Sequence, residues 1–320
     1  MMHTYDVVAL GELLIDFTSS GVSAQGNPML EANPGGAPCN VLALLAKMGR
    51  KPAFIGKVGD DAFGTQLENA LLETGISTEG LRKDPKIHTT LAVVQTMADG
   101  DRDFSFYRNP GADLMLTEDE LDADMIRNAK IFHFGSLSLT DEPARTATRK
   151  AIALAEEAGV LRSYDPNLRE PLWESLDAAK EQILWGLEHC DILKISDNEI
   201  QWLSGEEDFD KAVAWLRNAY PSIQLIFLTL GKDGSRAFYQ DVQAYQPGFS
   251  LNTIETTGAG DTFCASVLNF ALEQGVENLT EAQLTEMLRF ANAAAYLVTT
   301  KKGAIRSMPE LADVQAILAQ

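Results

Sequence analysis

Several short segments of the chain are almost entirely apolar and rich in β-branched and aromatic residues. Strands that lack polar alternation are buried on both faces, which is typical of parallel sheets covered by helices. The pattern predicts strands over Tyr5–Leu10, Ala53–Val58, Ile131–Phe134, Val160–Tyr164, Asp191–Ile195 and Gln224–Leu230.

Longer segments repeat apolar residues at intervals of three and four, which places them on one face of a helix. Strands and helices that alternate in this way predict an α/β protein with helices on both faces of a sheet. No internal repeat or proline-rich linker divides the chain, so we expect one domain over residues 1–320. Helices are predicted over Asn40–Met48, Asp61–Thr74, Glu142–Ala158, Asp210–Asn218, Asp261–Gln274 and Thr280–Thr300.

Two insertions interrupt this alternation. Residues 12–33 hold a short strand pattern and the turn-rich SSGVSAQGNP, and residues 87–111 hold LAVVQTM and DFSFYR around the turn ADGD. An Asp-Gly turn between alternating runs is a strong hairpin signal. We expect the insertions to pair into a small sheet that forms a lid over the ligand edge of the main sheet. Two unrelated surface hairpins are the alternative.

Charge and cysteine content narrow the function classes. The 320 residues include 46 acidic and 26 basic side chains, a net charge of −20 that disfavours binding to nucleic acids and membranes. Cys39, Cys190 and Cys264 lie far apart, which argues against disulfides and structural zinc. The N-terminal segment lacks the basic region of a signal peptide, and no apolar run approaches a membrane span. We therefore expect a cytoplasmic protein.

The strongest chemical signal is ETTGAGDTFCASVL, residues 255–268. Gly258, Ala259 and Gly260 precede a predicted helix, where free backbone N–H groups and the helix dipole form an anion hole. Asp261 is then placed to accept a proton from a nucleophile that attacks the anion. The alternative is a plain N-cap aspartate after a tight turn. The segment matches neither the P-loop pattern nor the dinucleotide GxGxxG.

Other segments offer groups suited to a polyol or a nucleotide. PGGAPCN, residues 34–40, supplies two glycines and the amide of Asn40. Asp16 ends the strand pattern LLID and can accept two hydroxyl hydrogen bonds, although a solvated aspartate is the commoner case. SYDPNLR, residues 163–169, and TLGKDG, residues 229–234, follow buried strands at the edge where open α/β sheets bind ligands.

Together these segments resemble the ribokinase-like, or PfkB, family of carbohydrate kinases over nearly the whole chain. The resemblance rests on PGGAPCN with IGKVGDDAFG downstream, and on TTGAGDTF. FYRNPGADLML, FHFGSLSL and SYDPNLR with PLW are similar to segments of bacterial and plant fructokinases. The resemblance implies a three-layer α/β/α domain with a central, mostly parallel sheet and a small β-sheet lid.

The resemblance implies ATP-dependent phosphorylation of D-fructose at its 6-hydroxyl. Asp261 would be the base, and Gly258, Ala259 and Gly260 would hold the transferring phosphoryl group. The sugar would be bound by Asp16, Gly35, Gly36, Asn40, Tyr107, Arg108 and Arg169. The ATP side would include Ser196, Glu199, Thr229, Gly231, Gly234 and Asn292. Mg²⁺ would arrive with ATP and be oriented by Glu199 through water.

The resemblance also implies a monovalent-cation site, K⁺ in many members, at Glu255, Thr257, Gly303 and Ser307. The family usually has aspartate where this chain has Glu255, and the extra methylene could preserve, shift or abolish the site. A second departure is Ser196, which replaces the asparagine of the family's Asn-x-x-Glu motif. Lid-to-lid dimers occur in the family, and a homodimer is expected here.

Three other functions stay open from the sequence, of which an inosine, guanosine or aminoimidazole riboside kinase is the most distant. A 2-keto-3-deoxygluconate kinase shares the Tyr-Arg of the lid and the Asp-Pro-Asn-x-Arg pattern, and would need Arg108 or Arg169 for the substrate carboxylate. The context FYRNPGAD favours fructose. A non-catalytic, fructokinase-like scaffold would be expected to lose the base or the glycine loop, and GAGD, residues 258–261, is intact.

Overall fold

The computed structural model describes residues 3–96, 102–249 and 253–319. Its described residues form a nine-stranded main sheet in which the seven strands from β11 to β5 pair in parallel and β12 and β13 are antiparallel. The strand order is β13 (Val242–Gln246), β12 (Ser235–Tyr239), β11 (Leu225–Thr229), β10 (Ile192–Ser196), β9 (Leu161–Asp165), β8 (Ala129–Gly135), β1 (Tyr5–Leu10), β4 (Pro52–Gly59) and β5 (Ser77–Asp84).

All six predicted strands are confirmed in this sheet. The edge strand β5 was not predicted, because its sequence STEGLRKD is mostly polar and only Gly80 is buried. The hairpin of β12 and β13 was also not predicted, because its short strands alternate buried and exposed positions only partly. Edge strands carry a weaker apolar signal than strands that are covered on both faces.

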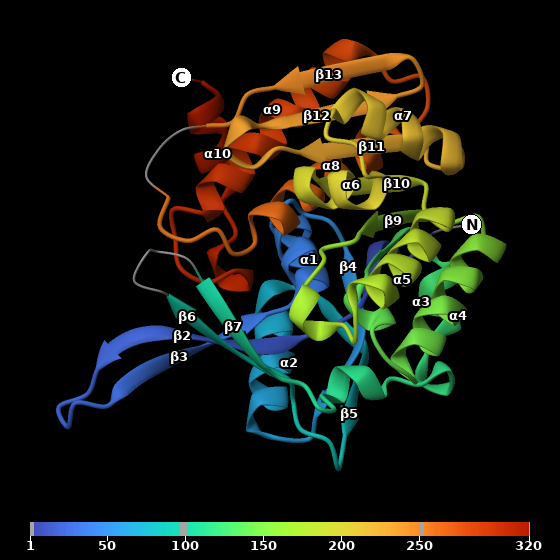
Figure 1. The fold of residues 1–320 in the computed structure, drawn as a ribbon. Coiled ribbons are helices and arrows are strands. Elements are labelled where there is room, and N and C mark those ends of the chain that lie inside the picture. Colours follow the sequence, from blue (N-terminus) through green and yellow to red (C-terminus); the bar gives the residue numbers. More distant parts are fainter. Residues whose placement is uncertain (1–2, 97–101, 250–252, 320) are drawn as a thin grey trace.

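Helices cover both faces of the main sheet (Figure 1), which confirms the α/β prediction. Within β1, Val7 and Ala9 belong to one core and Val8 and Leu10 to the other, as expected for a strand buried on both faces. In the first core, the sheet packs against α1 (Ala37–Lys47), α2 (Ala62–Thr74), α8 (Ala259–Gln274), α9 (Glu281–Val298) and α10 (Leu311–Leu318). In the second core, the other face of the sheet packs against α3 (Ala123–Arg127), α4 (Ala144–Glu157), α5 (Leu176–Glu188), α6 (Asp197–Ser204) and α7 (Phe209–Ala219).

The predicted start of the first helix at Asn40 is wrong, because α1 begins at Ala37. Pro38 occupies its first turn, where the missing N–H of a proline has no cost. Asn40 therefore lies in the first turn, and only 4% of it is exposed. Its amide points into the protein rather than into solvent.

The two predicted insertions pair into one small sheet (Figure 1). Its order is β3 (Pro28–Gly35), β2 (Leu14–Val22), β6 (Leu91–Thr96) and β7 (Arg102–Tyr107). β2 and β6 are parallel, so the two hairpins join side by side and are not unrelated surface features. The predicted ADGD turn, residues 98–101, lies outside the described residues. No described helix is long and apolar enough to cross a membrane. That residues 1–320 form one kinase domain stays a prediction.

Candidate active site

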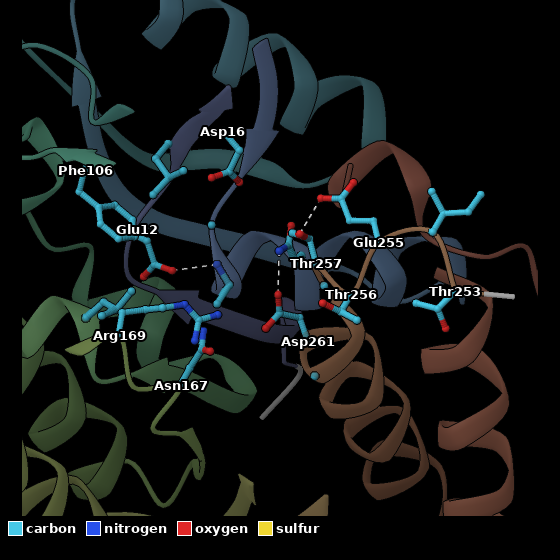
Figure 2. A pocket seen from close by; sticks show the side chains of 18 residues that line it. Glu12, Asp16, Phe106, Asn167, Arg169, Thr253, Glu255, Thr256, Thr257 and Asp261 are labelled. Atoms are coloured by element: carbon cyan, nitrogen blue, oxygen red, sulfur yellow. Dashed lines mark hydrogen bonds between the residues drawn. The ribbon is translucent and has the colours of Figure 1, made fainter. Parts of the chain in front are cut away.

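A cavity of about 640 Å³ separates the small sheet from the ligand edge of the main sheet (Figure 2). The small sheet contributes Asp16 from β2 and Phe106 from β7 to its lining. The main domain contributes Arg169 from the loop after β9, Asn40 from α1 and Asp261 from α8. The small sheet thus covers this cavity, as expected for a lid.

The N-terminus of α8 provides an anion site. Gly258 is the N-cap and has φ 79°, a left-handed conformation that favours glycine. The Ala259 amide donates to the Thr256 carbonyl at 3.2 Å and so closes the turn. Within the described residues, the amides of Gly258 and Gly260 have no backbone acceptor. Asp261 is not the N-cap, which removes the plain capping interpretation of this carboxylate.

Asp261 is held by Asn40, whose Nδ2 donates to Oδ2 of Asp261 at 2.7 Å (Figure 2). Burial raises the pKa of Asp261, and the hydrogen bond from Asn40 together with the charges of Lys194 and Arg169 opposes that rise. Oδ1 of Asn40 is buried and has no partner among the described residues. This amide therefore acts on the cavity through Nδ2 and its hydrogen bond to Asp261.

Asp16 lies across the cavity from Asp261, and its pKa is raised to about 7 by burial and then by the nearby charge of Glu255. A side chain on Gly35 would place its Cβ 2.2 Å from Oδ2 of Asp16, so glycine is required beside this carboxylate. Gly36 has φ 124°, and its Cβ would lie 2.4 Å from the Glu12 carbonyl oxygen. Of the two predicted glycines, Gly36 lines the cavity, whereas Gly35 is not in its described lining and only leaves room beside Asp16.

Glu12 also lines this cavity and was not predicted. Its Oε1 accepts a hydrogen bond of 2.8 Å from the Ala37 amide at the start of α1. Burial raises the pKa of Glu12 to about 7. A glutamate directly after an apolar strand and a glycine, as in VVALGE, was the available signal.

Two predicted sugar contacts lie elsewhere. The Arg108 guanidinium is buried, where Nε donates to Oδ2 of Asp113 at 2.8 Å, Nη1 to Oγ1 of Thr140 at 3.0 Å and Nη2 to the Leu137 carbonyl at 2.9 Å. It anchors the end of β7 to the main domain. Tyr107 is 64% exposed, and neither residue is in the described lining of the cavity. Phe106 takes this place instead.

A second cavity, of about 720 Å³, meets the first at Gly260 and Arg169. All six residues predicted for the ATP side line it, namely Ser196, Glu199, Thr229, Gly231, Gly234 and Asn292. The aromatic side chains of Trp202, Phe249 and Tyr296 add an apolar part. Its size and mixed lining suit a nucleotide.

Glu199 has a structural role at the wall of this second cavity. Its Oε1 accepts from the Leu168 amide at 2.8 Å, and its Oε2 accepts from the Ser196 amide at 2.9 Å and from the Ser196 hydroxyl at 2.7 Å. Burial alone would raise the pKa of Glu199, but the Lys194 ammonium and these hydrogen bonds hold it below its ordinary value. Ser196 thus closes a capping box at the start of α6, in place of the family's asparagine.

Lys194 and Asp165 form a buried ion pair that was not predicted. Nζ of Lys194 lies 3.0 Å from Oδ2 and 3.1 Å from Oδ1 of Asp165. A Cβ on Gly260 would lie 3.1 Å from the same Nζ, so the ammonium sits beside the anion site. A lysine inside the apolar strand DILKI was the available signal.

The two cavities meet beside the buried Asp261 carboxylate and the helix amides of Gly258 and Gly260, an arrangement typical of a phosphotransferase that acts on a small alcohol. Gly260 lines both cavities, and the next residue, Asp261, lines the first. The comparisons with known proteins agree. The chain belongs to the pfkB family of carbohydrate kinases, whose family model matches residues 4–311.

Relatives and solved structures extend this assignment over the full chain. The chain is 44% identical to Fructokinase-2 of Solanum lycopersicum over 98% of its own length and 95% of that protein. A fructokinase with bound ATP from Xylella fastidiosa has a TM-score of 0.89 at 28% identity, covering 98% of both chains. A fructokinase double mutant from Vibrio cholerae O395, bound to fructose, ADP and potassium ion, has a TM-score of 0.88 at 28% identity, covering 99% of this chain and 100% of that one.

Proposed function

We propose that this chain transfers the γ-phosphoryl group of ATP to the 6-hydroxyl of D-fructose. The observation that carries the proposal is the position of Asp261, which lines the polar cavity directly after Gly260, the residue shared with the nucleotide-sized cavity. Fructokinases are among the relatives at 44% identity, and one solved fructokinase of similar fold holds fructose and ADP.

In the proposed reaction, Asp261 accepts the proton of the 6-hydroxyl as its oxygen attacks the γ-phosphorus. The bond from this phosphorus to the β–γ bridging oxygen breaks, and ADP leaves with that oxygen. Negative charge spreads over the transferring phosphoryl oxygens, so positioning and electrostatic stabilisation supply most of the catalysis. The amides of Gly258 and Gly260 supply donors, and Arg169 and Lys194 supply positive charge.

Asp16 and Glu12 would bind sugar hydroxyls, and Asn40 would line the sugar site while its Nδ2 holds Asp261. Both carboxylates line the first cavity, and carboxylates can accept two hydroxyl hydrogen bonds. Gly35 and Gly36 leave room for the sugar beside these groups. The lid would exclude water, which otherwise competes as phosphoryl acceptor.

We further propose that Mg²⁺ accompanies ATP. Bound Mg²⁺ neutralises phosphate charge and keeps several water ligands. Glu199 already accepts three protein hydrogen bonds, so it suits an outer contact to such a water better than a direct bond to the ion. The described residues hold no cluster of three His, Cys, Asp or Glu for a resident metal, which fits an ion carried by the nucleotide.

The charges in the first cavity favour fructose over 2-keto-3-deoxygluconate. Its described lining includes four carboxylates, Glu12, Asp16, Glu255 and Asp261, and one cationic side chain, Arg169. Arg108 is committed to Asp113, Thr140 and Leu137. A substrate carboxylate would face net repulsion, whereas a neutral ketose needs only acceptors and donors for its hydroxyls.

A substrate panel tests the proposal. ADP release from Mg-ATP is measured with D-fructose, 2-keto-3-deoxygluconate, D-glucose and D-ribose, and the product is identified by phosphorus NMR. We expect the highest kcat/KM with fructose and a product phosphorylated at oxygen 6. Faster turnover of the keto-deoxy acid would overturn the substrate assignment and leave the kinase family intact.

We also propose a homodimer that forms through the lid, in a cytoplasmic setting. On the lid, Val22, Met29 and Leu30 are 66%, 43% and 47% exposed, which is unusual for large apolar side chains on one small sheet. Sedimentation of the wild type and of Met29→Lys/Leu30→Lys tests the dimer. A monomeric wild type would contradict it.

A further inference from the structure

Glu255, Thr257, Gly303 and Ser307 match residues that in many family members bind a monovalent cation. The structure brings the first three together in one small cavity beside the lid. Ser307 lies close by, since its Oγ would be 3.4 Å from a Cβ on Gly303. The residues that match the family's cation site therefore lie together in this structure.

The oxygens at this place already have protein partners. Oε1 of Glu255 accepts from the Thr257 hydroxyl at 2.7 Å, and Oε2 accepts from the Gly303 amide at 3.1 Å. The Ser307 hydroxyl donates to the Lys302 carbonyl. The Thr299 carbonyl accepts from the amides of Ile254 at 2.8 Å and Glu255 at 3.0 Å. The Glu255 carboxylate is therefore already held by the Thr257 hydroxyl and the Gly303 amide without an ion.

We propose that the Glu255 carboxylate takes the place of the monovalent cation and joins the two loops directly. The longer side chain spans from the loop before α8 to the Gly303 amide in the loop after α9. Aspartate, one methylene shorter, would leave a gap that an ion fills. On this account the protein needs no K⁺.

This contact bears on the proposed reaction because the loop that carries Glu255 also forms the anion site. Gly258 is three residues on, and its Cβ position lies 3.3 Å from Cβ of Ala304, the residue after Gly303. Glu255 is thus a positioning residue that fixes the amides of Gly258 and Gly260 without touching either substrate's reacting atoms.

The test compares the wild type, Glu255→Asp and Glu255→Gln in potassium, sodium and choline chloride at equal ionic strength. Glu277→Gln, at an exposed glutamate, is the matched control. The readouts are fructose-dependent ADP release and the melting temperature. The melting temperature does not depend on which sugar is the substrate. It therefore tests the role of Glu255 even if the enzyme turns out not to phosphorylate fructose.

We expect the wild type and Glu277→Gln to show the same turnover and melting temperature in all three salts. Glu255→Gln should lose about tenfold or more in turnover in every salt, because the loop is no longer held. Glu255→Asp should be as slow in choline, and K⁺ should restore its turnover and raise its melting temperature. Activation of the wild type by K⁺, full activity of Glu255→Gln, or a Glu255→Asp enzyme that is indifferent to K⁺ would each overturn the proposal.

Discussion

Asn40 and Asp261 lie 221 positions apart in the sequence and are joined by a hydrogen bond of 2.7 Å from Nδ2 to Oδ2. The bond links the N-terminus of α1 to that of α8 and occupies one oxygen of the Asp261 carboxylate. It also favours the ionised carboxylate and so opposes the burial that raises its pKa. Asn40 therefore orients the proposed base and keeps it ready to accept a proton.

Asn40→Ala should lower kcat/KM for fructose by about tenfold or more, because hydrogen bonds to charged groups contribute about 1.5–3 kcal/mol. Loss of the bond raises the pKa of Asp261, so the acid limb of the pH–rate profile should move to higher pH. Asn218→Ala on the exposed side of α7 is the control. An acid limb that stays in place would show that Asn40 does not act on Asp261.

Asp16→Asn should stabilise the sugar-free protein at pH 8 while it weakens fructose binding. The folded-state pKa of Asp16 is about 7, against an ordinary value of 3.8, so folding retains a proton between these values and stability falls as pH rises through them. The variant removes this loss, and each gain of about 1 kcal/mol corresponds to roughly 1.5 °C in melting temperature for a chain of this length. The gain should vanish near pH 4. An equal melting-temperature change at both pH values would contradict the raised pKa.

The buried pair of Lys194 and Asp165 gives a prediction that separates stability from activity. Asp165→Asn removes the carboxylate that pairs directly with the buried ammonium and should reduce the free energy of unfolding by about 3–5 kcal/mol. The double variant Asp165→Asn/Lys194→Met should recover most of that stability but not turnover, because the positive charge beside Gly260 is lost. Denaturant unfolding and kcat measure the two effects. A double variant with wild-type kcat would exclude Lys194 from the reaction.

Arg108 and Arg169 should respond in opposite ways to substitution. Arg108→Ala leaves Asp113 buried without its partner and should cost about 3–5 kcal/mol in stability, with little change in KM for fructose in the folded enzyme. Arg169 is exposed and lines both cavities, so Arg169→Ala should reduce turnover with little effect on unfolding. The same unfolding and kinetic measurements compare the two variants. A large rise in KM from Arg108→Ala would restore its predicted contact with the sugar.

Much of the fold was predictable because its signals are local. Parallel strands buried on both faces are mostly apolar, as in β1 and β11, and the turn signal around ADGD indicated the hairpin of the lid. The glycine loop and Asp261 were predictable because a helix N-terminus can be recognised from adjacent residues. β5 was missed because an edge strand does not need an apolar sequence.

The partners of each site residue were not predictable, since they come from other parts of the chain. Nothing near Arg108 in the sequence shows that its guanidinium reaches Thr140 and the Leu137 carbonyl. Likewise, the pairing of Lys194 with Asp165 requires β10 to lie beside β9. The effect of Glu255 was also not predictable from the sequence. It depends on which neighbouring groups the carboxylate reaches with its extra methylene, and these neighbours come from other parts of the chain.

The most direct test of the proposed reaction compares fructose-dependent ADP release by the wild type and Asp261→Asn at saturating ATP and fructose. Asp241→Asn, an exposed aspartate in the turn between β12 and β13, is the matched control. The account predicts that Asp261→Asn loses at least about a hundredfold in kcat, the lower end for general-base catalysis, while Asp241→Asn keeps the wild-type rate. An Asp261→Asn enzyme that turns over fructose at the wild-type rate would contradict the account.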